Sequence, residues 1–410
     1  MAPHRVVVTG IAGISPIGND WNAIRHHLGT YLNAVRFMEG WDAYADLNTK
    51  LGARAAPFEI PNYPSFENLS DMGMVSKMAV RTTELALADA GLLHDTILKS
   101  GKLGIAFGSC SGAPEGFIDV WKTMEDKSTK AMDSSTYFKI LPHTTTISIA
   151  STFGITGRVI TTSSACTSSS QAIGYAYETI KHGRQVAMVA GGAEELHAIQ
   201  AAVFDTLFAT STKNAAPSTT PSPFDINRDG LVLGEGSCSL ILEEYEHALA
   251  RGAKIYAEIV GFGTNSDGCH VTNPNQPTMK MAMQLALDDA GLDSQSIGYI
   301  NAHGTATEKG DIAETGATFE IFGGNVPISS LKSYTGHTLG ACGGLESWVT
   351  IEMMREGWFA PTLNLTKVDP LCGDLDYIVG SAREFQCEYA MSNNFAFGGI
   401  NTSLIFRKIL

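Results

Sequence analysis

Short, mainly apolar segments recur along the chain, separated by longer segments of mixed polarity. Clear examples lie at 5–13, 103–108, 185–190 and 239–242. A strand that is apolar on both faces suits a sheet that helices cover on both sides. The longer segments between the runs place apolar residues at helical spacing. The pattern therefore predicts an α/β fold.

Two distant segments have nearly the same sequence. Residues 85–92 read Leu-Ala-Leu-Ala-Asp-Ala-Gly-Leu, and residues 285–292 read Leu-Ala-Leu-Asp-Asp-Ala-Gly-Leu. Each is expected to close an amphipathic helix at a glycine, with a strand ending in glycine upstream and a short apolar strand downstream. We therefore expect two related halves, 1–250 and 251–410, packed as pseudo-duplicates with their sheets covered by helices.

Two further segments depart from this alternation. Residues 110–165 are long and polar, and they predict a cap or a surface for contact with a partner. Residues 209–224 are rich in Ser, Thr, Ala and Pro and predict a loop. No Pro-rich or Ser-rich linker separates the halves, so the chain is expected to form one rigid unit.

Composition narrows the function. The 410 residues carry a formal net charge of −14, which argues against nucleic acid and anionic membranes as partners. The seven cysteines include no C-x-x-C pair, so they predict reduced thiols in a cytoplasmic protein rather than disulfides or a zinc site. No signal peptide or membrane span is evident. Phosphate loops, dinucleotide fingerprints and metal-binding spacings are also missing, so no ATP, NAD or metal is expected.

Cys166 is the first candidate for chemistry. It lies between a β-like segment, 158–162, and a helix-like segment, 172–182. A thiol at a helix N-terminus faces free backbone N–H groups and partial positive charge, which favour the thiolate. Cys166 is thus a candidate nucleophile. The alternative is a buried cysteine that packs as a small hydrophobe.

Two histidines stand out among the eleven. His303 occurs in Asn-Ala-His-Gly-Thr, and His337 in Lys-Ser-Tyr-Thr-Gly-His, each after an apolar strand. Strand ends are where α/β proteins present catalytic groups, and histidine can stabilise a transient anion or move a proton. The alternative is a turn histidine that satisfies a local backbone group.

A second cysteine competes with Cys166 as nucleophile. Cys110 occurs in Gly-Ser-Cys-Ser-Gly, the spacing of a nucleophile elbow, and it too follows a strand. This signal is weak, since an elbow also needs an acid and a histidine downstream, and any long chain contains both.

Taken together, these motifs resemble the elongating β-ketoacyl-carrier-protein synthases of the thiolase-like superfamily over nearly the whole length. The motifs are Thr-Ser-Ser-Ala-Cys at 162–166, Val-Ala-Gly-Gly-Ala-Glu at 189–194, Pro-Phe-Asp-Ile-Asn-Arg-Asp-Gly at 223–230, Gly-Glu-Gly at 234–236, the two histidine motifs, and Asn-Phe-Ala-Phe-Gly-Gly at 394–399. The resemblance implies the duplicated αβαβα layered fold of that superfamily.

The resemblance also implies an activity. Cys166 would hold an acyl chain as a thioester, and malonyl-acyl-carrier protein would lose carbon dioxide and attack it. The product would be a 3-oxoacyl-carrier protein in fatty acid or polyene/polyketide elongation. No cofactor would be bound, because the carrier protein delivers the phosphopantetheine arm.

Roles for individual residues follow from the same resemblance. His303 and His337 would stabilise the enolate, and Lys332 would order the site with Glu314 as its buried partner. The backbone N–H groups of Cys166 and Phe397 would form the oxyanion hole. The residues expected to contact substrate are Thr305 and Thr307 at the phosphopantetheine arm, Phe397 as a gate, and Phe204 in the acyl pocket.

Three departures from the family pattern concern the gate and the surface that meets the carrier. Ala396 replaces a usual glycine, so gate motion is expected to differ. The stretch 65–73 holds two acids and no bases, where relatives often have basic clusters. Phe208 stands where relatives often have Arg. The remaining candidates for carrier docking are the surface cations Lys77, Arg81, Lys122, Lys127, Lys130 and Lys213.

These departures suggest a specialised ketosynthase, of an aryl-polyene or other secondary pathway. It would act as a homodimer or as a heterodimer with a related subunit of the chain-length-factor type. Two alternatives stay open: a thiolase-type enzyme that condenses coenzyme A esters, and a weakly active partner subunit of a ketosynthase heterodimer.

Overall fold

The computed structural model describes residues 3–63, 72–269 and 271–409. Its main sheet has the strand order β13-β11-β10-β15-β16-β9-β1-β8-β6-β4-β5. The strands of the first half are β1 (Val6–Ile14), β4 (Leu103–Gly108), β5 (Val159–Thr162), β6 (Ala187–Glu194) and β8 (Gly236–Glu244). Those of the second half are β9 (Ala257–Ser266), β10 (Ile297–Asn301), β11 (Pro327–Ser329), β13 (Asp376–Tyr377), β15 (Tyr389–Phe395) and β16 (Ile400–Lys408).

The two halves of this sheet repeat one topology. The order β5-β4-β6-β8-β1 matches β11-β10-β15-β16-β9, with parallel pairing at β5-β4-β6 and antiparallel pairing at β6-β8-β1, and the same in the second half. The halves join where β1 pairs with β9. The expected duplicated α/β fold is therefore confirmed.

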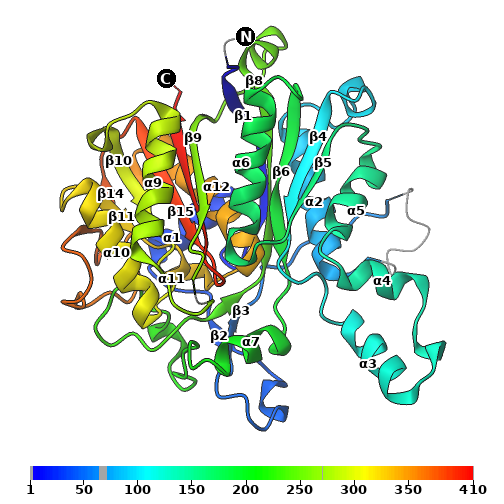
Figure 1. Ribbon diagram of the computed structural model, residues 1–410, viewed down its shortest axis with the longest axis horizontal. Coiled ribbons are helices and arrows are strands. Elements are labelled where there is room, and N and C mark those ends of the chain that lie inside the picture. Colours follow the sequence, from blue (N-terminus) through cyan, green and yellow to red (C-terminus); the bar gives the residue numbers. More distant parts are fainter. Residues whose placement is uncertain (1–2, 64–71, 270, 410) are drawn as a thin grey trace.

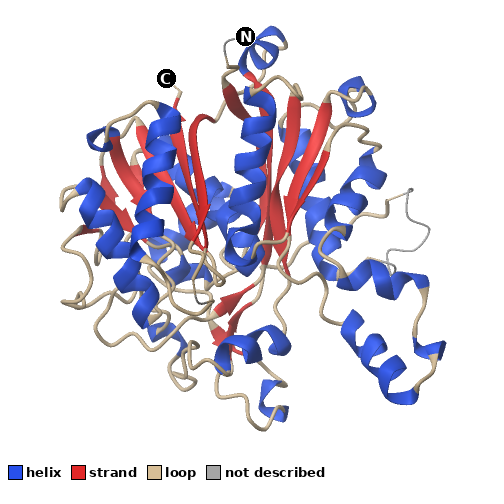
Figure 2. Ribbon diagram, in the orientation of Figure 1, coloured by secondary structure: helices blue, strands red, loops and turns tan. Residues whose placement is uncertain are grey.

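Helices lie on both sides of the sheet halves (Figures 1 and 2). The described helices are α1 (Trp21–Thr30), α2 (Met74–Asp89), α3 (Gly116–Asp126), α4 (Ser134–Ile140), α5 (Thr144–Phe153), α6 (Ser168–Lys181), α7 (Ala198–Asp205), α8 (Tyr245–Ala250), α9 (Gln276–Ala290), α10 (Glu308–Phe322), α11 (Lys332–Thr335) and α12 (Cys342–Glu356). Small sheets are formed by β2 (Arg36–Phe37), β3 (Leu51–Ala53) and β7 (Leu233–Gly234), and by β12 (Trp358–Phe359) with β14 (Arg383–Glu384).

The near-identical segments end equivalent helices, as expected. α2 packs on β1 and β8, and α9 packs on β9 and β16. Gly91 and Gly291, which follow the two helices, both have positive φ, +70° and +65°. Glycine adopts this left-handed conformation without strain, so it stops each helix at the same point.

α6 and α12 form the middle layer. They contact each other as well as strands of the sheet, and α12 is buried along almost its whole length. The close fit is visible at Gly174 of α6, where an added Cβ would lie 2.2 Å from the ring of Phe262 on β9. In this layer the N-termini of α6 and α12 lie close together between the halves.

The two irregular segments differ in content. Residues 110–165, expected to form a cap, contain α3, α4 and α5, and α5 packs against α2 and β4. The loop expected at 209–224 has one short 3-10 turn, Pro217–Thr219.

Most of the acidic stretch 65–73 lies outside the described residues. Among the helices that the structure describes, none combines the length and apolar character needed to cross a bilayer.

Candidate active site

Cys166 lies in the tight connection between β5 and α6. A 3-10 turn, Ala165–Thr167, precedes the helix, and Ala165 before the cysteine has a φ of +50°. A residue other than glycine seldom adopts this conformation, and such strain gathers at functional sites. The connection points the thiol into the space between the halves, where Cys166 is only 4% exposed.

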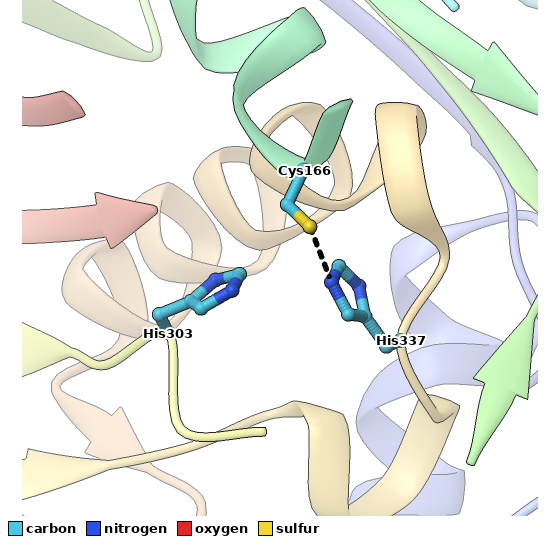
Figure 3. A group of neighbouring side chains, drawn as sticks. All are labelled: Cys166, His303 and His337. Carbon is cyan, nitrogen blue, oxygen red and sulfur yellow. Dashed lines mark hydrogen bonds between the residues drawn. The ribbon is translucent and has the colours of Figure 1, made fainter. Parts of the chain in front are cut away.

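The equivalent connection of the second half faces it. The 3-10 turn Leu339–Ala341 precedes α12 as the Cys166 turn precedes α6, and Leu339 has a φ of +47°. His337 lies just before this turn, and His303 follows β10. Figure 3 shows both imidazole rings pointing toward the cysteine from separate loops. His337 Nε2 is 2.9 Å from Cys166 Sγ, and the two ring centroids are 5.1 Å apart.

Donors behind the two rings select the tautomer of each histidine. The backbone N–H of Leu339 donates to His337 Nδ1 at 3.2 Å. The Lys332 ammonium lies 3.1 Å from His303 Nδ1, and an ammonium can only donate. Because Nδ1 accepts in both rings, the proton of each neutral imidazole is on Nε2. Both histidines therefore offer an N–H donor on the side facing the cysteine.

Burial keeps these imidazoles neutral. It lowers the pKa of His303 well below its ordinary value, and the charges of Lys332 and His337 act in the same direction. Burial and Lys332 also hold the pKa of His337 well below the ordinary range. Neutral donors persist through physiological pH, which suits hydrogen bonding to an anion better than proton transfer.

The buried partner of Lys332 is Glu346, which corrects the expectation of Glu314. The Lys332 ammonium contacts the Glu346 carboxylate, with the two side chains 1% and 4% exposed. Burial opposes the charge of Lys332, but Glu346 leaves its pKa raised. Glu314 instead accepts the backbone N–H groups of His303 and Gly304, both at 2.7 Å, and burial raises its pKa to about 8.

Glu346 and its neighbour Asn394 were missed as site residues. The Asn394 amide donates to Glu346 at 2.7 Å and lies 3.5 Å from His303 Nδ1. Asn394 opens the terminal Asn-Phe-Ala-Phe-Gly-Gly motif, so its position offered a signal. Glu346 lies inside α12 without a motif of its own, and only the fold brings it to Lys332.

The protonation of Cys166 differs from the expectation based on the helix alone. Burial raises the pKa of the thiol, and the backbone N–H groups of Phe397 and Cys166, together with Lys332, act in the opposite direction. The net direction is upward, so the resting form is the thiol. Expecting the helix end to favour a thiolate neglected the cost of burying a charge.

A cavity of about 440 Å³ leads from the surface to this centre. It is lined by Cys166, His303, His337, Thr305, Thr307, Phe204 and Phe397 together with residues of the mouth. Lys332 lies behind His303 and is not in the lining. The rings of Phe204 and Phe397 meet edge to face at 5.8 Å, and the Thr305 and Thr307 hydroxyls are 3.0 Å apart. Apart from Lys332, the cavity thus brings the expected catalytic and substrate-contacting side chains together.

The terminal loop accommodates Ala396 without strain. Positive φ angles in this loop fall on Gly398 and Gly399, at +95° and +80°, and not on Ala396. A methyl group at 396 therefore does not force the backbone of the Phe397 loop into an unfavourable region. Whether gate motion differs from that of relatives stays a prediction.

Cys110 lies beside the site but has different surroundings. Its backbone N–H donates to buried Glu194 at 2.6 Å, and burial raises the pKa of its thiol. Within the described part of the chain, no histidine hydrogen-bonds to its sulfur, whereas His337 reaches Cys166 Sγ. The geometry favours Cys166 as nucleophile.

Two overlapping groups of side chains could in principle hold a metal ion. They are Cys166, His303 and His337, and His303, Cys342 and Glu346, with ligand atoms within 4.8 Å of one another in each group. Cys342 hydrogen-bonds to the Cys166 carbonyl at 3.2 Å. The expectation that the enzyme uses no metal stays a prediction.

Comparison with known proteins places this arrangement among the thiolase-like ketosynthases. A β-ketoacyl synthase from Burkholderia phymatum STM815 has a structure of TM-score 0.97 and 55% identity, covering 99% of this chain and 100% of that one. A chain from the complex of a type II PKS acyl-carrier protein with its ketosynthase (AntDE:AntF) superposes with a TM-score of 0.89. It is 28% identical, and the match covers 100% of both chains.

Sequence comparison gives the family. Residues 4–248 match the β-ketoacyl synthase N-terminal domain, and residues 256–366 match the C-terminal domain. The 3-oxoacyl-[acyl-carrier-protein] synthase 2 of Vibrio harveyi is 37% identical over 425 residues, covering 100% of both chains. The chain belongs to the β-ketoacyl synthase family.

Proposed function

We propose that the protein catalyses decarboxylative condensation of an acyl thioester with malonyl-acyl-carrier protein, giving a 3-oxoacyl-carrier protein. The observation that supports this proposal most directly is that Cys166 and two neutral histidines lie together, buried, at the end of a cavity that opens at the surface. Family membership and the 3-oxoacyl synthase relative support the same reaction.

In the first half-reaction, Cys166 takes the acyl group. The sulfur attacks the carbonyl carbon of the incoming thioester, the bond to the carrier's sulfur breaks, and the cysteine proton leaves with the carrier thiol. The backbone N–H groups of Cys166 and Phe397 flank the sulfur and would bind the transient oxyanion. Splitting the reaction in this way predicts ping-pong kinetics.

In the second half-reaction, the malonyl group loses carbon dioxide and becomes an enolate. The Nε2–H groups of His303 and His337 would hold the enolate oxygen in a site without bulk water. The enolate carbon then forms a bond to the acyl carbon, the bond to Cys166 Sγ breaks, and the thiolate takes up one proton. Decarboxylation supplies the carbanion, so no strong base is needed.

Residues around this centre would position the substrate. Thr305 and Thr307 line the same cavity as the histidines, and a phosphopantetheine arm that enters it would pass along them. Phe204 and Phe397 would border the acyl chain. Lys332 acts through His303 as a positioning residue. The protein needs no bound cofactor under this proposal, because the arm arrives on the carrier.

Several broader expectations belong to the same proposal. Residues 1–250 would supply the nucleophile and 251–410 the histidines, and the protein would work in the cytoplasm as a homodimer or with a related subunit. A specialised polyene or other secondary pathway would be its setting. The thiolase alternative wants a second reactive cysteine near the terminal glycine loop, and residues 393–401 contain none.

Intact and peptide mass spectrometry after incubation with a panel of acyl-carrier proteins tests the proposal. An acyl group on Cys166, absent from Cys166→Ala and retained in Cys110→Ala, is the expected result. Release of carbon dioxide and a 3-oxoacyl-carrier protein after malonyl-carrier protein is added completes the test. Acylation of Cys110, or no acylation of the wild type by any carrier, would contradict it.

A further inference from the structure

Phe208 projects into solvent at the end of α7. It is 88% exposed, and its φ of +54° lies in the left-handed region. The backbone N–H of Phe208 donates to the Asp205 carbonyl at 2.9 Å, and that of Ala209 donates to the Phe204 carbonyl at 3.0 Å. This pair of bonds closes a helix around a left-handed residue, and glycine is the residue that usually occupies that position.

The fold itself gains little from an aromatic ring at this position. A side chain in the left-handed region strains the backbone, and an exposed ring buries little apolar area within the chain. Glycine would remove the strain and keep both hydrogen bonds. A strained, exposed phenylalanine therefore indicates a contact with something outside the chain.

Phe208 lies at the mouth of the cavity that ends at Cys166. Leu207 and Phe208 line the mouth from the turn that follows α7, and Val271, which is 57% exposed, lines it from the other half. One turn back in α7, Phe204 touches the ring of Phe397 deeper in the cavity. We call Leu207, Phe208 and Val271 the apolar rim. Any macromolecule that inserts an arm toward Cys166 must come close to it.

Cations beside the rim are already engaged within the chain. Arg228 pairs with Asp369 at 2.7 Å and with Asp311 at 3.5 Å, and its side chain is 2% exposed. Lys213 pairs with Asp229 at 3.4 Å. Lys309, also at the mouth, hydrogen-bonds to the Asn273 side chain. Carboxylates thus compensate Arg228 and Lys213, whereas Lys309 meets only a neutral amide. With one uncompensated cation of these three, and a net charge of −14 on the chain, attraction of a negatively charged partner is weak here.

We propose that the apolar rim is the docking surface for the acyl-carrier protein, and that Phe208 is its central contact. The inference rests on the proposed function, which requires a carrier protein to reach Cys166 through this mouth. The carrier that fits presents apolar side chains beside its phosphopantetheine attachment. Docking then depends on burial of Phe208 rather than on charge pairs, and it selects among carriers by their apolar surface.

Steady-state kinetics of Phe208→Gly tests this inference, using the carriers that acylate the wild type and, in parallel, an acyl-pantetheine thioester that has no protein part. We expect kcat/KM for the carrier substrates to fall at least tenfold, mainly through KM, and to fall at least tenfold more than kcat/KM for the acyl-pantetheine. Thermal stability is expected to stay equal or rise. Phe208→Leu should recover part of the loss.

Two controls separate the possible causes. Tyr31→Gly removes an aromatic residue with a φ of +56° at the end of α1, outside the cavity lining, and should change neither activity. Lys309→Ala removes a cation at the mouth of the cavity, so its effect on kcat/KM measures how far docking depends on charge. Raising NaCl from 50 to 500 mM should change wild-type kcat/KM less than threefold, because apolar contacts are not screened.

The outcomes are distinguishable. Equal losses of Phe208→Gly on carrier and acyl-pantetheine substrates would overturn the docking inference and leave the proposed function standing. A loss confined to Lys309→Ala, with a steep salt dependence, would assign docking to charge and also overturn it. Wild-type protein inactive on both substrates would overturn the proposed function itself.

Discussion

Replacing Lys332 by methionine isolates the buried ion pair behind His303. Methionine keeps most of the length of lysine, so the main change is the loss of the ammonium. The Glu346 carboxylate, 4% exposed, then keeps only neutral side-chain donors, the amides of Asn394 and Asn301. Removing one partner of a buried pair costs about 3–5 kcal/mol of unfolding free energy, because the remaining charge is uncompensated.

The double variant Lys332→Met/Glu346→Gln should recover most of that loss. It removes both charges, and the glutamine amide can still accept from Asn394, so we expect it within about 2 kcal/mol of the wild type. A double-mutant cycle measures this coupling: urea unfolding, followed by circular dichroism at one protein concentration, compares the wild type, Lys332→Met, Glu346→Gln and the double variant. If the two single losses add in the double variant to within about 0.5 kcal/mol, the pair is not coupled and the reasoning is wrong.

The same variants separate stability from catalysis. Both versions with methionine at 332 lose the closer donor at His303 Nδ1 and keep only the Asn394 amide at 3.5 Å, so Nε2 no longer carries the proton reliably. Malonyl decarboxylation is expected to fall by about 10–100-fold even in the stable double variant, as when an orienting hydrogen bond is lost. Acylation of Cys166 should fall much less, since His303 serves the second half-reaction. Full decarboxylation by the double variant would contradict the tautomer assignment.

Three further predictions concern the nucleophile, the packing of α6 and the buried carboxylate Glu194. Burial raises the pKa of Cys166, so its alkylation by iodoacetamide should accelerate with pH beyond the ordinary thiol range; a plateau below pH 8 would contradict this. Gly174→Ala forces a methyl group against Phe262 and should lower the free energy of unfolding in urea by about 1–3 kcal/mol. Gly29→Ala, whose added Cβ would lie 3.6 Å from Arg25 Nη1, should instead stabilise the protein by about 0.5–1 kcal/mol. Burial raises the pKa of Glu194 to about 7, so between pH 4.5 and pH 7 the folded state keeps a proton that the unfolded state has lost. As the pH rises through this window, the free energy of unfolding of the wild type should fall by roughly 3 kcal/mol relative to that of Glu194→Gln. Parallel pH profiles of unfolding free energy for the two proteins would refute this reasoning.

Most of the local framework was predictable because it depends on residues close together in the chain. The helix ends at Gly91 and Gly291, the strand before Cys166 and the loops with His303 and His337 follow from neighbouring residue types. Their repetition indicated the duplicated fold. Local pattern failed at Lys332, where Glu314 was expected but Glu346, from a different helix, makes the contact.

The amino-acid sequence specifies the reactive groups and the family in which they occur, because motifs encode local backbone and side-chain chemistry. The tertiary structure decided how those groups behave. It buried Cys166 enough to keep its proton, placed donors at the Nδ1 atoms of both histidines, and left Phe208 exposed at the mouth. These properties depend on desolvation and on contacts between residues far apart in the chain, which no local pattern contains.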